Sequence, residues 1–112
     1  MSLRVTVKTP LDITKGSTLL TACNRHCRFV KFDETNQIIN GVVSRADKTS
    51  TSFSVSLLTM EIVYDSSQSW VPQRINEIYQ VQRVIEESEA MGRIVTESVN
   101  EDGEFVLEVE YA

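Results

Sequence analysis

The sequence has few of the residue types that specialised sites and scaffolds require. Among 112 residues there are two cysteines, two prolines, four glycines and one histidine. Two cysteines are too few for a disulfide framework, so a reducing, cytoplasmic location is expected. The glycines form no phosphate-binding loop, and a single histidine cannot complete an H-E-x-x-H motif. The sequence therefore offers no recognised catalytic signature, and we expect a non-catalytic protein without a cofactor.

Long apolar runs are also missing. No stretch approaches the roughly 18 consecutive apolar residues that span a bilayer. No charged-then-apolar segment suggests a signal peptide either. We expect no membrane contact, and the length fits a single domain over residues 1–112 with one modest core.

Charge is unevenly distributed along the chain, whose net charge is −5. Residues 1–56 contain eight Lys/Arg and four Asp/Glu, a net +4, whereas residues 57–112 contain three and twelve, a net −9. The halves can attract each other within one fold. Alternatively, they can form surfaces that bind nucleic acid or that pair two subunits.

A long amphipathic helix is predicted from Val71. Pro72 suits the first helical turn, where its missing N–H costs nothing, and Ser69 is a candidate cap. Gly92 provides a C-terminal stop. One apolar arc requires one partner surface, most simply a sheet. The arc consists of Val71, Ile75, Ile78, Val81 and Ile85, with Val84 at its edge.

A β-hairpin that turns at residues 100–103 (Asn-Glu-Asp-Gly) is predicted to follow the helix. A two-residue turn would place Glu97 opposite Glu108, two like charges. A three-residue turn with a left-handed Gly103 instead pairs Val99 with Phe105. We predict the second register, with four alternating apolar side chains facing inward. These are Phe105, Leu107, Val109 and Tyr111.

Glu97 is the residue that does not fit this hairpin. The chosen register pairs Val95 with Val109 and sets Glu97 opposite Leu107, on the apolar face. Either Glu97 lies near the rim of the sheet, or it belongs to a site.

The rest of the chain reads as strands around a short ambiguous segment. Residues 3–8, 27–32 and 38–43 are strand candidates, and residues 17–25 are either a two-turn helix capped by Ser17 or irregular. Residues 47–52 are expected to form a loop. The longest strand candidate runs from residue 53 to 64, and its apolar phase changes at residues 57–58, which predicts a bulge or a strand that crosses between two packing environments.

These elements predict an α+β fold. We expect a mainly antiparallel sheet of five to six strands with the long helix packed on one face, and we expect the C-terminal hairpin to complete the sheet.

The C-terminal third resembles the end of a cyanobacterial and plastid family, the hypothetical chloroplast open reading frame proteins, whose domain has no known function. The resemblance rests on the helix at residues 75–90, on Gly92 and Val95, on the turn at residues 100–103, and on Leu107 with Val109. It implies an α+β fold and a cyanobacterial, plastid or phage source. It implies no catalytic role.

The densest group of reactive residues is the segment Cys23-Asn-Arg-His-Cys27. In a helix, Cys23, His26 and Cys27 would share one face, and thiolate with imidazole suits zinc. A structural site would need a fourth ligand, and no second Cys/His pair is present. Two buried cysteines and a surface histidine explain the same residues, so we predict no metal and keep this trio as the one candidate.

A basic strand face with stacking aromatic rings is an alternative that points to single-stranded nucleic acid. Its candidate residues are Arg25, Arg28, Lys31 and Arg45, with Phe29 and Phe32. Strict alternation argues against it, because it places Arg28 on the opposite face from Lys31.

The C-terminal half would present an acidic surface. An acidic face can bind a basic partner, or it can keep a small domain soluble and protect an edge strand. The candidate partner-binding residues are Glu97, Glu104, Glu108 and Glu110. Three further glutamates near the end of the helix, at positions 86, 87 and 89, oppose the helix dipole and indicate a basic neighbour.

Our leading expectation is therefore a small non-catalytic protein that acts through a protein partner, with itself as the expected partner in a homo-oligomer such as a homodimer. Single-stranded nucleic-acid binding by the basic N-terminal half is the alternative.

Overall fold

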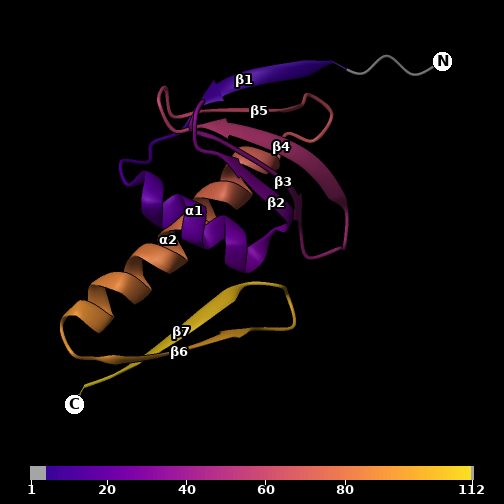
Figure 1. Ribbon diagram of the computed structural model, residues 1–112. Helices are drawn as coiled ribbons and strands as arrows, with labels where there is room; N and C mark the ends of the chain where they lie inside the picture. The colour runs from indigo at the N-terminus through magenta and orange to yellow at the C-terminus, as the bar shows by residue number, and fades with distance from the viewer. Residues whose placement is uncertain (1–4, 112) are drawn as a thin grey trace.

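The computed structural model describes residues 5–111, which form seven strands and two helices (Figure 1). In chain order the elements are β1 (Thr6–Pro10), α1 (Gly16–His26), β2 (Arg28–Asp33), β3 (Ile38–Ser44), β4 (Ser50–Ser56), β5 (Glu61–Asp65), α2 (Val71–Ala90), β6 (Ile94–Val99) and β7 (Phe105–Glu110).

Five strands form one antiparallel sheet in the order β1-β5-β4-β3-β2. Its inner face carries alternate residues of each strand, and both helices cover this face. The core between the sheet and the helices includes Leu19, Ile39, Val55, Ile62, Ile75 and Ile78, all nearly inaccessible to solvent. The predicted α+β class, with a mainly antiparallel sheet and a long helix on one face, is confirmed.

The long helix α2 begins at Val71, as expected, with Pro72 in its first turn. The five residues of the predicted apolar arc are buried, and Val84 at its edge is half-buried. Gly92 follows with φ of +77° and ends the helix. The predicted cap was wrong: Trp70 occupies the capping position, and no side chain caps the helix. Among residues 5–111, no helix is long and apolar enough to cross a membrane.

The ambiguous segment after residue 15 is the helix α1. Its four buried residues, Thr18, Leu19, Ala22 and Cys23, recur at helical spacing and face α2 and the sheet. Lys15, not Ser17, precedes the helix at the capping position, and its side chain makes no capping bond. The sheet face is therefore covered by two helices, of which the sequence clearly indicated only the longer.

The expected long strand from residue 53 to 64 is wrong. The chain reverses at residues 57–60, so β4 and β5 are neighbouring antiparallel strands, and Val55 lies opposite Ile62 on the inner face. The reversal explains the change of apolar phase that suggested a bulge. The turn contains no glycine, proline or asparagine, which hid it, and Met60 adopts a φ of +52° there. The expected loop at residues 47–52 is also shorter, because β4 begins at Ser50.

The expectation that the C-terminal hairpin completes the large sheet is wrong. The hairpin forms a two-stranded sheet of its own. In Figure 1 the two helices separate it from the five-stranded sheet. Its predicted register is confirmed: Val99 pairs with Phe105, Glu97 lies opposite Leu107, and Gly103 has a φ of +79°. Tyr111 was wrongly assigned to the inner face, because it lies past the last paired residue and is 74% exposed.

Candidate interaction surfaces

The hairpin is attached to the helices through Glu97, the residue that did not fit its apolar face. The Glu97 carboxylate accepts a hydrogen bond from the Arg25 guanidinium at the end of α1, and the two form an ion pair. Its other oxygen, Oε1, lies 3.2 Å from His26 Nε2. The Glu97 side chain is only 15% exposed, so interactions of its carboxylate with Arg25 and His26 of α1 take the place of hydration by water.

A chain of polar side chains continues from Arg25 along the groove between the helices. Arg25 Nη1 donates to Gln82 Oε1 at 2.6 Å, and Gln82 Nε2 donates to Glu86 Oε1 at 3.3 Å. Thr18 Oγ1 donates to Glu86 Oε2 at 2.6 Å. Arg25 is thus a basic neighbour of the acidic end of α2, linked to Glu86 through Gln82, and Arg83 of α2 itself pairs with Glu87 at 3.2 Å. At this point the basic and acidic halves of the chain meet inside the fold.

His26 lies at the centre of this junction, and its pKa is lowered there. Burial lowers its pKa below the ordinary 6.5, and the positive charges of Arg25 and Arg74 act in the same direction, while Glu97 opposes them. Nε2 is close to Glu97 Oε1, yet this buried nitrogen makes no hydrogen bond. The site therefore favours the neutral imidazole.

Phe105 of β7 provides the apolar part of the same attachment. The His26 ring meets it edge-on, with centroids 5.0 Å apart and planes at 69°. The Arg74 guanidinium of α2 lies over its face at 4.8 Å. Arg74 is itself held by the Ser44 carbonyl at 3.2 Å and by Glu77 at 3.3 Å. One aromatic ring thus ties β7 to both helices and, through Arg74, to β3.

The turn of the hairpin rests on the loop between β3 and β4. A Cβ atom at Gly103 would collide with the Ala46 side chain and lie 3.3 Å from Ala46 Cα. A groove of about 720 Å³ opens beside this contact, between the loop, the first turns of α2 and Phe105. Its wall includes carboxylates from different elements, among them Asp47 of the loop and Glu77 of α2.

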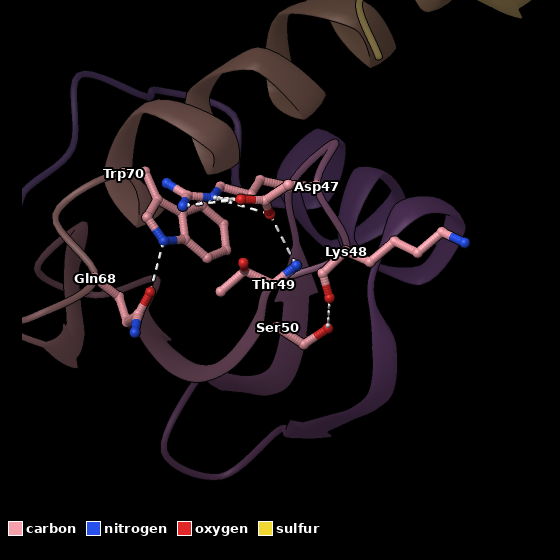
Figure 2. A network of polar contacts seen from close by, with 7 residues as sticks. Asp47, Lys48, Thr49, Ser50, Gln68 and Trp70 are labelled. Carbon is pink, nitrogen blue, oxygen red and sulfur yellow. Dashed lines mark hydrogen bonds and ion pairs between the residues drawn. The ribbon is translucent and has the colours of Figure 1, made fainter. Parts of the chain in front are cut away.

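The loop beside the groove is fixed by its own polar contacts (Figure 2). Asp47 accepts hydrogen bonds from Arg45 and from the Thr49 backbone, and these bonds lower its pKa. The Arg45 guanidinium lies 5.4 Å from the centre of the Trp70 ring, and Trp70 Nε1 donates to Gln68 Oε1 at 2.7 Å. Arg45 and Asp47 are therefore paired with each other, and Arg45 also links the loop to Trp70 before α2.

The two cysteines face each other at the end of α1. The buried Cys23 thiol donates to the Cys27 sulfur, which raises the pKa of Cys23 and lowers that of Cys27. His26 turns toward the hairpin instead of joining them. Within residues 5–111, no three His, Cys, Asp or Glu side chains gather as a metal site would require. The trio thus has separate roles in packing and in the attachment of the hairpin.

The four glutamates expected to bind a partner occupy different positions. Glu97 faces inward and is committed to α1. Glu104 flanks the turn, where Asn100 Nδ2 lies 3.3 Å from its Oε1. Glu108 and Glu110 are exposed on the outer face of β7, opposite Thr96 and Ile94 of β6. Only the latter two form a shared surface.

The four basic residues of the nucleic-acid alternative are also divided. Arg25 and Arg45 are engaged with Glu97 and Asp47. Arg28 and Lys31 lie together on the outer face of the large sheet, opposite the helices. This corrects the alternation argument: Arg28 pairs with Val42 and Lys31 with Asn40, so β2 contains one extra residue, and both cations face the same side.

Sequence reasoning missed Arg74 and Gln82 as parts of the junction. Gln82 lies next to the apolar arc of α2 and is buried, and Arg74 is half-buried. A polar residue inside or beside an apolar arc was the available signal, but its partners come from α1 and β7, and helical periodicity does not reveal them.

Comparisons with protein-family models, curated proteins and solved structures found no match to this chain. The resemblance to the chloroplast open reading frame family stays a prediction.

Proposed function

We propose that this protein is a non-catalytic module that associates with a second copy of itself through the C-terminal hairpin. The observation that supports this proposal most directly is the free edge of β6. Among the described residues, the backbone of β6 is paired only with β7, so its other edge presents unpaired N–H and C=O groups. Such an edge is a template for a further strand.

The two edges of the hairpin differ in charge. On the outer face, β7 carries Glu108 and Glu110, and charged side chains of this kind discourage edge-to-edge pairing. The outer positions of β6 are Ile94, Thr96 and Ser98, all uncharged. The one charge within β6, Glu97, is already paired with α1. Antiparallel pairing of β6 with its copy would bring together two uncharged edges and give a four-stranded sheet.

Exposed apolar side chains are concentrated in the same C-terminal part of the chain. Within residues 5–111, five of the eight exposed large hydrophobic residues lie between residues 91 and 111: Met91, Ile94, Val99, Val106 and Tyr111. An isolated two-stranded hairpin is marginally stable in water, and it gains stability when more strands are added. Burial of this apolar surface against a copy contributes about 25 cal/mol for each Å² removed from water.

Sedimentation velocity over protein concentrations from micromolar to millimolar tests the proposal, with a concentration-dependent dimer as the expected result. A strict monomer across that concentration range would contradict the proposal.

Thr96→Lys is the informative variant. Thr96 lies opposite Glu108, so the lysine gains a cross-strand partner that stabilises the hairpin by about 0.2–1 kcal/mol. The same lysine puts a charge on the edge through which β6 pairs with its copy, and charged side chains at a strand edge discourage such pairing. We expect weaker dimerisation with an unchanged or higher melting temperature. Thr96→Val, which keeps the branched shape and adds no charge, is the matched control and should dimerise like the wild type.

A further inference from the structure

Phe29 combines a costly backbone conformation with an exposed aromatic ring. Its φ is +54°, a left-handed value that a bulky residue rarely adopts, and its side chain is 78% exposed. Strained backbone and an exposed aromatic ring are both unfavourable for folding. Residues held in this way concentrate at binding sites, where the strain orients the side chain toward a ligand.

The residues around Phe29 form a built surface on the outer face of the sheet. The bulge in β2 turns Arg28 and Lys31 to the same side as the ring. Arg28 Nη2 donates to Ser50 Oγ at 3.0 Å, which holds the guanidinium on this face. A shallow hollow of about 570 Å³ extends from Phe29 and Lys31 across Asn40 and Ser54.

The rest of this face is rich in hydroxyl and amide groups. Alternate positions of β3 and β4 place Asn40, Ser44, Ser50 and Ser54 outward. Ser54 donates to Asn40 Oδ1, and the hydroxyls of Ser44 and Ser50 are 2.7 Å apart. Such groups can hydrogen-bond to base edges and to sugars.

The charge around Phe29 suits an anion, although the whole chain is acidic. The carboxylate on β2, Asp33, is already bonded to the Asn36 amide and backbone at 2.8 and 3.1 Å. Two further carboxylates, Glu61 and Asp65, belong to β5, which is separated from β2 by two strands. Asp65 lines the β5 end of the same hollow, where it accepts hydrogen bonds from the backbone and the hydroxyl of Ser67. The acidic helix α2 and the hairpin lie on the other side of the sheet (Figure 1).

We propose that the outer face of β2 and β3 binds single-stranded nucleic acid, with a base stacked on Phe29 and the flanking phosphates held by Arg28 and Lys31. An aromatic ring on a sheet flanked by cations is the arrangement that single-strand binders use, because every base has a stacking face and every linkage carries a negative charge. This site is separate from the hairpin and does not depend on self-association.

Fluorescence anisotropy with labelled ten-nucleotide oligo(dT) and oligo(U) tests the proposal, with the full chain titrated at 25 to 200 mM salt. Two phosphate contacts predict a slope of log K against log salt of about −1.4. We expect Lys31→Gln and Arg28→Gln each to weaken binding and to reduce this slope by about half. Lys15→Gln, an exposed lysine before α1, is the matched control and should bind like the wild type.

Phe29→Gly separates binding from folding. Glycine adopts a positive φ without strain, so the variant should be as stable as the wild type or more stable. Loss of the stacking ring should weaken binding by about tenfold or more. Leu58→Ala, which removes an exposed apolar side chain from the turn between β4 and β5, should leave binding unchanged.

Three results would overturn this site: no binding by the wild type at 25 mM salt, a salt slope of zero, or Phe29→Gly binding as tightly as the wild type.

Discussion

The five-stranded sheet and the C-terminal hairpin are both antiparallel, yet they are stabilised in different ways. The sheet buries a complete inner face under two helices, and residues such as Ile39 and Ile62 are fully inaccessible. The hairpin has no such cover. The inner side chains of Val95, Leu107 and Val109 remain half-exposed, and specific contacts at Glu97, Phe105 and Gly103 hold it against the rest of the molecule.

The region that contributes most to the stability of the fold is therefore not the region that is most accessible to a partner. The inner face of the sheet, which the helices cover, contributes most of the hydrophobic free energy, and its apolar side chains are not accessible to a partner. A hairpin that is held by a few polar and aromatic contacts keeps an unpaired edge and exposed apolar residues. Regions of low local stability are where binding surfaces commonly lie.

The largest expected change in the free energy of unfolding comes from a buried residue of the sheet, compared with a half-exposed residue of the hairpin. Ile62→Ala removes a fully buried side chain and should lower the free energy of unfolding by about 2–5 kcal/mol. Val95→Ala, in the half-exposed hairpin, should cost less than about 1 kcal/mol. Urea denaturation measures both. Similar losses would mean that the hairpin is as fully packed as the sheet, and the comparison would fail.

Two glycines with the same backbone conformation sharpen the comparison at the hairpin turn. Gly92 and Gly103 have φ values of +77° and +79°, but only Gly103 approaches another residue, Ala46. Gly92→Ala should cost about 1 kcal/mol for the left-handed conformation alone. Gly103→Ala should cost about 2–3 kcal/mol, because the added methyl group also displaces the turn.

Hydrogen exchange of the amides in β6 and β7 measures the effect of the glycine variants. Ala46→Gly combined with Gly103→Ala should recover part of the lost protection. Equal effects of the two single substitutions would show that the turn does not rest on the β3–β4 loop.

Removing the charge at Glu97 tests the polar attachment of the hairpin. Glu97→Gln leaves Arg25 and His26 without their carboxylate and should cost about 1 kcal/mol, since Arg25 is partly solvated. Glu108→Gln, an exposed glutamate on the other strand, should change stability by less than about 0.5 kcal/mol. Thermal unfolding and hairpin hydrogen exchange distinguish the two. Equal effects would remove Glu97 from the attachment.

The smallest effect is the pH dependence of the same junction. The pKa of His26 is lowered in the folded protein, so the unfolded chain takes up this proton first as the pH falls. The contribution of the neutral imidazole is complete above about pH 6.5 and is lost progressively below that value. Stability should therefore fall slightly from pH 7.5 to pH 5.5, and His26→Asn should flatten that part of the profile. A wild-type profile that is level or rises toward pH 5.5 would contradict the assignment.

Local patterns in the sequence predicted several elements in detail. The helix wheel identified the buried arc of α2, because a 3.6-residue period leaves one face to the core. The cost of opposing Glu97 to Glu108 selected the register of the hairpin and the left-handed Gly103. The same register marked Glu97 as the residue without a place on its face, and this residue proved to be the centre of the junction.

Other features depended on contacts between distant segments. The turn at residues 57–60 lacked the usual turn residues, so a hairpin was read as one strand. The bulge at Phe29 arises where β2 pairs with β3, and strict alternation could not reveal that Arg28 and Lys31 share a face. The partner of Glu97 was equally hidden, because Arg25 lies 72 residues away along the chain.

The sequence by itself thus determined the α+β class, the course of α2 and the internal pairing of the hairpin, because periodicity, turn geometry and like-charge repulsion act between residues that are close in the chain. Only the tertiary structure decided that the hairpin stands apart from the large sheet and leaves the second edge of β6 without a neighbouring strand. That choice depends on which surface the helices leave open, and it is made by long-range packing that no local period encodes.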